Sequence, residues 1–240
     1  MRKIIVWTPI NTSGHFPALE NDPKWMTRRC EIMNQYVIPS MRAQTCKDFE
    51  WWIEVREDTV GFITPRLALD GLPSVILPRP IITDHKSGKN AAWERLDADV
   101  RARITDPTFL EVRLNSDDLY HRDYIQTLQR MEIIPGTQAI LPRAGYYWYL
   151  SQKALCKTVH NSPPFYTLIY DTEKWLAGYR HPLPGGHRAA RKLRNQDVPG
   201  RQWVWIVHDV NNKIVRKGAG AYADHLGHVT SLDRIKEFGQ

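Results

Sequence analysis

The chain has 240 residues and a formal net charge of +7, because 33 Lys and Arg residues outnumber 26 Asp and Glu residues. Its hydrophobic content of 42% and charged content of 25% are typical of a folded domain, and they exclude global disorder, a collagen-like chain and a coiled coil. The three cysteines lie far apart and form no CxxC pair, which argues against a zinc ribbon or a redox dithiol.

The chain opens with a strand pattern followed by a helix pattern. Residues 3–8 form a short apolar run that ends at Pro9 and is typical of a buried strand. The next apolar side chains recur every three or four positions and predict one face of a helix: Met26, Cys30, Met33, Val37 and Met41. Pro39 is expected to kink or break the end of this helix.

Strands and helices continue to alternate up to about residue 132. The patterns predict strands at residues 49–55, 73–78 and 108–114, a helix within residues 84–104, and another helix with Asp123 as its N-cap. Such an order implies an α/β fold with a largely parallel sheet and helices on its faces.

The pattern changes after residue 132. Residues 137–150 are typical of a hairpin that turns near residues 143–145, residues 202–208 predict another strand, and residues 226–238 have helical spacing. Residues 187–194 hold four cations, and this segment is either a solvated basic surface or a phosphate-binding surface.

Polar residues follow three of the predicted strands at the points where they end. They are Thr8 and Pro9 after the first strand, Arg56 to Asp58 after the second, and Asn115 to Asp118 after the fourth. Ligands bind outside the carboxyl ends of the strands in an open α/β sheet. We therefore expect these groups to meet at one edge of the sheet.

The adjacent acids Asp117 and Asp118 need compensation if they follow a buried strand. Two neighbouring carboxylates repel each other, and the pKa of one rises unless a cation lies nearby. Mg²⁺ or Mn²⁺ would supply the charge and would hold a diphosphate. The simpler alternative is that one of the acids caps the next helix.

Four segments carry a resemblance to a known family. They are the opening strand with Arg28 and Arg29 in the next helix, PSMRAQT followed by DFEW in residues 39–51, RLNSDDL in residues 113–119, and WIVHDVN in residues 205–211. Together they resemble the nucleotide-sugar glycosyltransferases of the GT-A type, and most closely a rhamnosyltransferase-like group. The resemblance implies a single GT-A (Rossmann-like) domain, with a nucleotide-sugar half at residues 1–132 and an acceptor half at residues 133–240.

The resemblance implies a metal site in the acidic segment. This segment matches the DxD-type motif of the family, with Asn115 in place of the first acid, Asp117 as the remaining metal ligand and Asp118 beside it. A late His of such enzymes often joins the metal or the diphosphate, and His208 is at this position. The expected cofactor is Mn²⁺ or Mg²⁺, although the neutral amide of Asn115 weakens the expected metal affinity.

Other residues are expected to hold the nucleotide sugar. The resemblance implies that Glu57 or Asp58 contacts the nucleobase or ribose and that Thr8 and Pro9 lie against the nucleoside. Phosphate contacts are expected from Asn211, Lys213, Arg216 and Lys217. Arg28 is also expected to bind the nucleotide sugar.

The catalytic base is expected among the later acids. An inverting transfer needs a carboxylate within reach of the acceptor hydroxyl, and Asp171 and Glu173 are candidates. The alternative is a solvated surface pair, and a retaining transfer needs no such base.

These patterns favour a metal-dependent hexosyl- or pentosyltransferase. The expected acceptor is a cell-surface glycan precursor or a 5-hydroxymethylpyrimidine in DNA, as for DNA-modifying enzymes of phages. The net charge and the basic segment at residues 187–194 favour DNA. The consecutive rings at residues 146–149 either pack in the core or stack on sugars or bases. The charge and the rings also fit a non-catalytic nucleic-acid-binding protein. No apolar run is long enough to span a membrane, so we expect a cytoplasmic protein, in the host cytoplasm if it is of phage origin.

Overall fold

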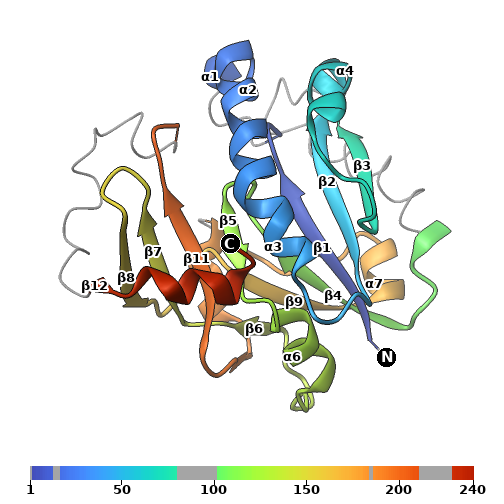
Figure 1. Cartoon of the computed structure of the whole chain (residues 1–240). Helices are drawn as coiled ribbons and strands as arrows, with labels where there is room; N and C mark the ends of the chain where they lie inside the picture. Colours follow the sequence, from blue (N-terminus) through green and yellow to red (C-terminus); the bar gives the residue numbers. More distant parts are fainter. Residues whose placement is uncertain (1, 13–16, 80–101, 184–185, 211–228) are drawn as a thin grey trace.

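The computed structural model describes residues 2–12, 17–79, 102–183, 186–210 and 229–240, and their strands form two sheets (Figure 1). Across the first sheet, the strands are β10 (Asn195–Asp197), β6 (Ala139–Leu141), β9 (Tyr166–Asp171), β4 (Thr108–Arg113), β1 (Lys3–Pro9), β2 (Glu50–Arg56) and β3 (Ser74–Arg79). Across the second, they are β12 (Val229–Thr230), β8 (Ala154–Val159), β7 (Ala144–Tyr149), β11 (Arg201–Val207) and β5 (Asp118–Tyr120).

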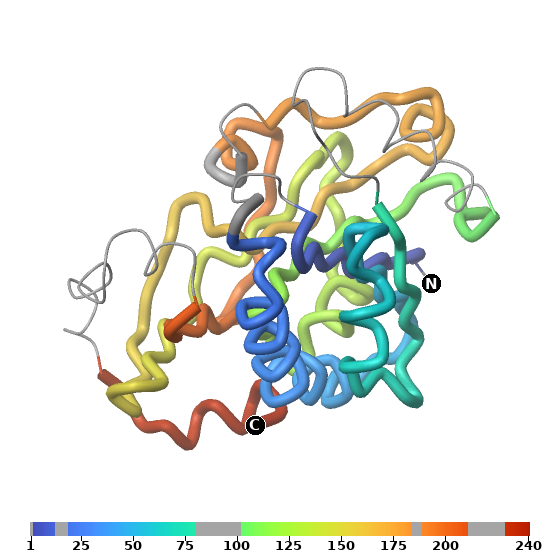
Figure 2. The backbone as a smooth tube through the Cα atoms, turned by 90° about the horizontal axis from the view of Figure 1, so that it is seen from above, coloured from blue at the N-terminus to red at the C-terminus, as the bar shows by residue number. Residues whose placement is uncertain are grey.

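Helical segments connect and cover these strands. In chain order they are α1 (Pro17–Glu20), α2 (Pro23–Ile32), the π-helical η1 (Met33–Val37), α3 (Ile38–Arg42), η2 (Glu57–Thr59), α4 (Val60–Ile63), η3 (Thr64–Arg66), α6 (Tyr124–Arg130), α7 (Thr172–Leu176), η4 (Gly186–Lys192) and η6 (Leu232–Phe238). Seen from above, α2 lies between the strands of the second sheet and residues 57–79 (Figure 2). No helix within the described ranges is long and apolar enough to cross a membrane.

The centre of the first sheet is parallel, as the alternating pattern predicts. β1 lies between β2 and β4 and runs parallel to both, and β3 extends the parallel set beyond β2. β9 then pairs antiparallel with β4 and with β6. The predicted strands at residues 3–8, 49–55, 73–78, 108–114 and 202–208 are confirmed to within one residue at most boundaries.

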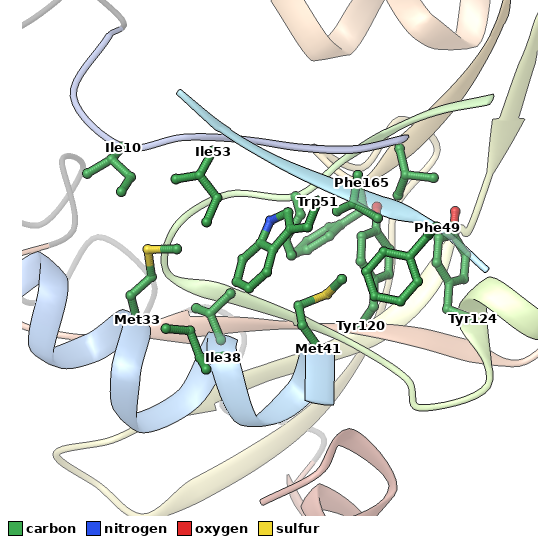
Figure 3. Packing of buried hydrophobic residues seen from close by; sticks show 14 of the residues in the cluster. Ile10, Met33, Ile38, Met41, Phe49, Trp51, Ile53, Tyr120, Tyr124 and Phe165 are labelled. Atoms are coloured by element: carbon green, nitrogen blue, oxygen red, sulfur yellow. The ribbon is translucent and has the colours of Figure 1, made fainter. Parts of the chain in front are cut away.

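The predicted helix after β1 is confirmed, but its expected break is wrong. All five apolar residues of the predicted face are buried. The helix runs through Pro39 to Arg42. Proline has no backbone N–H to donate, and the wider π-helical turn η1 just before it lets the helix continue without that hydrogen bond. Figure 3 shows Met33, Ile38 and Met41 pointing from this helix toward Trp51 of β2.

The predicted hairpin at residues 137–150 is wrong. β6 pairs with β9 and β10 of the first sheet, whereas β7 pairs with β8 and β11 of the second. Pro142 lies between β6 and β7 and has no N–H for a strand ladder. Its carbonyl instead accepts a 2.6 Å hydrogen bond from the indole of Trp203. The segment therefore passes from one sheet to the other.

The two expected halves of the chain exchange strands. β5 comes from the first half and joins the second sheet, while β6, β9 and β10 come from the second half and join the first sheet. The predicted tail helix is partly described and is the 3-10 segment η6. Most of the helix predicted within residues 84–104 lies outside the described residues.

Gly145 lets β7 and β11 approach closely, and this contact carries a stability prediction. A Cβ atom at Gly145 would lie 2.1 Å from the ring of Trp203, which is fully buried. We expect Gly145→Ala to lower the free energy of unfolding by about 1–3 kcal/mol in a urea titration, because the ring has no room to move. Gly61→Ala is the control, since a Cβ there meets nothing within 4 Å. Equal losses in the two variants would contradict the contact.

Candidate functional site

Two strand ends from different sheets meet beside helix α2. β4 ends at Arg113, and the chain turns through residues 114–117 into β5. β11 pairs antiparallel with β5, with Trp205 opposite Asp118, so the end of β11 returns to the same turn. The turn stays next to the parallel strands, because the N–H of Leu114 donates to the carbonyl of Trp7 in β1. The site lies at the carboxyl ends of the parallel strands, where ligands bind in such sheets.

Arg29, Asp117 and His208 form one buried polar group at this place, which we call the Asp117 cluster. Nε2 of His208 lies 3.1 Å from Oδ2 of Asp117, and the guanidinium of Arg29 forms an ion pair with the same oxygen. The side chains are 5% (Arg29), 12% (Asp117) and 1% (His208) exposed. Three segments far apart in the sequence therefore bring two cationic or hydrogen-bonding groups to one carboxylate.

The hydrogen bonds of His208 define its tautomer. The backbone N–H of Val210 donates to Nδ1 of His208, so Nε2 carries the proton and donates it to Asp117. Burial raises the pKa of Asp117, but the Arg29 charge and the His208 hydrogen bond outweigh this and hold the pKa well below its usual range. Asp117 is therefore ionised in the folded protein at neutral pH.

Arg29 is the residue of this cluster that the sequence motifs include but that was not predicted as a site residue. Its guanidinium also donates to the carbonyl of Val210 and lies 4.7 Å from the ring centroid of Trp25. Its buried Nε has no hydrogen-bond partner in the described part of the structure. A signal was present, because position 29 adjoins the apolar stripe of Met26, Cys30 and Met33 and so had to face inward.

Asp118 turns away from the Asp117 cluster. It is completely buried, its Oδ1 accepts from the N–H of Ile206, and its Oδ2 accepts a 2.6 Å hydrogen bond from the side chain of Asn115. Burial and the neighbouring Asp117 raise its pKa well above the usual value. The expectation that Asp118 contacts a ligand therefore has no support in this placement. The alternative of a helix N-cap is wrong for both acids, because Asp117 directly precedes β5 and Asp118 is its first residue.

The residues expected near the nucleoside lie at two depths. Thr8 is fully buried, and its Oγ1 accepts a 2.8 Å hydrogen bond from the indole of Trp51, so it belongs to the core. Pro9 is half-buried at the carboxyl end of β1. Glu57 and Asp58 are exposed in η2 at the carboxyl end of β2.

Asp58 is held in place by a neighbouring arginine. Nε and Nη2 of Arg56 lie 3.1 Å and 2.6 Å from its two oxygens. Two strand spacings, about 10 Å, separate β2 from β4, so Asp58 and the Asp117 cluster lie along one edge of the sheet.

Arg28 lies on the rim of the cluster. Its guanidinium contacts the carboxylate of Asp209 at 3.3 Å and that of Glu31 at 3.1 Å, and its side chain is 37% exposed. Arg28 therefore links α2 to the residue that follows His208. The expected phosphate contacts, Asn211, Lys213, Arg216 and Lys217, lie outside the described residues.

Asp171 and Glu173 lie at the opposite edge of the sheet. β9 is antiparallel to β4 and places Asp171 opposite Thr108, the first residue of β4. The six residues of β4, about 17 Å, therefore separate them from the turn that carries Asp117. Asp171 caps α7, since its Oδ1 accepts from the N–H of Lys174. We therefore do not assign the catalytic base to Asp171 or Glu173.

The donor atoms of the Asp117 cluster do not fit a resident divalent cation. No group of three or more His, Cys, Asp or Glu side chains is arranged for a metal ion among the described residues. Oδ2 of Asp117 already pairs with Arg29. The Nε2 of His208 carries a proton, whereas a metal-binding His offers a lone pair there and donates from its other nitrogen.

Three solved structures match the chain at low similarity. The inositol-1-phosphate CTP transferase from T. maritima is 14% identical with a TM-score of 0.40, and the match covers 92% of this chain and 96% of that one. TarS from S. aureus is 10% identical with a TM-score of 0.39 and coverage of 86% and 37%. HddC from Yersinia pseudotuberculosis is 10% identical with a TM-score of 0.39 and coverage of 85% and 92%. These likenesses are too weak to indicate a function.

A family model gives the stronger finding. No curated protein sequence matches the chain. The family model described as "Putative rhamnosyl transferase" matches residues 18–162, which is more than half of the chain and includes both Arg29 and Asp117. This match confirms the resemblance that the sequence motifs indicate. The chain therefore belongs to the putative rhamnosyl transferase family, and it is a glycosyltransferase.

Proposed function

We propose that the chain transfers a sugar from a nucleotide-diphosphate donor to a hydroxyl group, with the donor diphosphate held at the Asp117 cluster. The observation that carries this proposal is the meeting of Arg29, Asp117 and His208 at the carboxyl ends of the parallel strands. This edge is the ligand-binding edge of such sheets. Membership of the family supplies the reaction class.

The arginine of the cluster suits the leaving group of this reaction. In the transfer, the bond between the anomeric carbon and the diphosphate oxygen breaks, and its electron pair remains on the diphosphate. The acceptor oxygen bonds to the anomeric carbon and releases its proton to water. Arg29 offers fixed N–H donors to the developing negative charge, and a buried guanidinium stabilises such charge more strongly than an exposed one.

Asp117 holds the arginine rather than the substrate in this proposal. An unpaired guanidinium at this depth would be costly, and the carboxylate of Asp117 offsets that cost. His208 fixes the rotamer of Asp117 through its Nε2 hydrogen bond. The nucleoside then extends along the edge of the sheet toward Pro9, Glu57 and Asp58.

The acceptor is proposed from the surface charge. Arg191, Lys192 and Arg194 are exposed in and just after η4, and such a basic surface attracts a phosphate backbone. This observation favours a hydroxymethylated DNA acceptor over a glycan precursor.

Two measurements test the donor and the acceptor separately. We expect at least one sugar nucleotide from a panel to raise the melting temperature of the wild-type chain, because a ligand stabilises the state that it binds. Mass spectrometry of nucleosides from hydroxymethylated DNA then shows whether a sugar is added with that donor, and a glycan-precursor extract serves as the second acceptor. No stabilisation by any sugar nucleotide would contradict the proposed function.

A further inference from the structure

We propose that Arg29 takes the place of a divalent cation in this chain, so that the Asp117 cluster binds the donor diphosphate without a metal ion. This inference rests on the proposed function. It follows from the contacts of the cluster itself, which pair the carboxylate of Asp117 with a protein cation.

The charge of Asp117 is balanced by a cation of the protein itself. Asp117 carries one negative charge and Arg29 one positive charge, and the two side chains are in direct contact. Asn115 is neutral where the related motif has an acid. Asp118 is buried against Asn115 and the N–H of Ile206, facing away from Arg29. Oδ2 of Asp117 and both oxygens of Asp118 are therefore already engaged by groups of the protein and are not open to a metal ion.

A metal ion would have to break two sets of contacts to enter the cluster. It would have to displace Arg29 from Asp117, and Arg29 is also held by the carbonyl of Val210 and the ring of Trp25. It would also have to move the proton of His208 from Nε2 to Nδ1, where the backbone N–H of Val210 now donates. That change would leave two N–H groups facing each other.

The unused donor of Arg29 gives the anion its place. Nε of Arg29 is buried and has no hydrogen-bond partner within the described ranges. More than nine-tenths of the side chain is removed from water, so water does not replace that partner. A buried N–H without a partner is costly, and a phosphate oxygen would satisfy it with a charge-assisted hydrogen bond. The guanidinium therefore faces Asp117 on one side and has a donor left for the diphosphate.

The first test measures metal and nucleotide binding separately in the full chain. We expect electron paramagnetic resonance to show no tight Mn²⁺ binding by the wild-type protein alone. We expect calorimetry with UDP, dTDP and GDP to find at least one ligand whose Kd in EDTA lies within about threefold of its Kd with excess Mn²⁺. Nucleotide binding that requires Mn²⁺ would overturn the inference and leave the proposed function intact. No binding of any nucleotide or sugar nucleotide in either buffer would overturn both.

The second test changes the arginine. We expect Arg29→Met to weaken nucleotide binding in EDTA by about tenfold or more, and to gain Mn²⁺ binding because Asp117 is then uncompensated. Arg29→Lys keeps the charge and is expected to bind nucleotide without metal. Lys24→Met removes one exposed positive charge from the same helix and is expected to change neither property. Unchanged nucleotide binding in folded Arg29→Met, or equal losses in Arg29→Met and Lys24→Met, would overturn the inference.

Discussion

Asp117→Ala is expected to lower the free energy of unfolding by about 3–5 kcal/mol at neutral pH, because it leaves the buried charge of Arg29 without its partner. The two side chains are in direct contact and only 5% and 12% exposed. A loss of this size is typical of a buried ion pair that has lost one partner. It is several times the free energy by which an exposed ion pair stabilises a protein. Urea titration followed by tryptophan fluorescence measures it.

Two further variants separate the ion pair from general damage. Asp117→Asn keeps the shape of the side chain and loses its charge, so we expect a smaller loss of stability than with Ala. Asp233→Asn removes a carboxylate from an exposed pair with Lys236, and we expect no measurable change. If Asp117→Ala were as stable as Asp233→Asn, the buried ion pair would not exist.

The same pair predicts a dependence on pH. The pKa of Asp117 is lower in the folded than in the unfolded chain. Such a carboxyl contributes its full stabilisation above its unfolded pKa of about 3.9 and loses it as the pH falls toward the folded value. The stability difference between wild type and Asp117→Asn should therefore stay constant from neutral to weakly acidic pH and shrink below pH about 4. A difference that grows in acid would contradict this sign.

Strong local patterns were sufficient for the parallel centre of the first sheet, for the helix after β1 and for β11. β1, β2, β4 and β11 are mostly apolar runs of strand length, and such runs are typical of buried strands. The helix face after β1 was equally clear. The expected break at Pro39 failed because a π-helical turn can absorb a missing hydrogen bond, and such a turn leaves no mark in the apolar spacing.

Strand direction and pairing were not available from local patterns. No strand was predicted at β9, and a local pattern does not show that β9 runs antiparallel to β4. This direction places Asp171 opposite the first residue of β4, at the far edge of the sheet. The false hairpin at residues 137–150 has the same origin, because two strands adjacent in sequence joined different sheets. In both cases tertiary packing determines which strand each strand pairs with and in which direction.

The candidate site was predictable in position and only partly in composition. Ligands bind at the carboxyl ends of the strands in an open α/β sheet, and this rule indicated the turn with Asp117. His208, just after the end of β11, lies beside Asp117. The sequence indicated Arg28 as a binding residue, whereas the structure places Arg29 in the cluster. Arg28 points to the rim and Arg29 to the buried carboxylate, and this difference is one residue on a helix.

Asn115→Asp is expected to lower the free energy of unfolding by about 1–3 kcal/mol at mildly alkaline pH. The side-chain amide of Asn115 donates a 2.6 Å hydrogen bond to Asp118, which is fully buried. A carboxylate at position 115 would place two acceptors at that distance, and one of them would have to take up a proton. Burial already raises the pKa of Asp118, so the folded variant would hold this proton well above the usual carboxyl range.

The sign of the pH dependence identifies this mechanism. A folded variant that binds one more proton than its unfolded chain loses stability as the pH rises, so the loss in Asn115→Asp should shrink toward pH about 5. Asn115→Ala removes the hydrogen bond without adding charge, and its loss should change little over the same range. A pH-independent loss in Asn115→Asp would show that the two side chains do not share a proton. A neutral residue is then required at position 115 because Asp118 accepts a hydrogen bond from its side chain. Asp118 also accepts a hydrogen bond from the N–H of Ile206, and this bond holds β11 and His208 against Asp117.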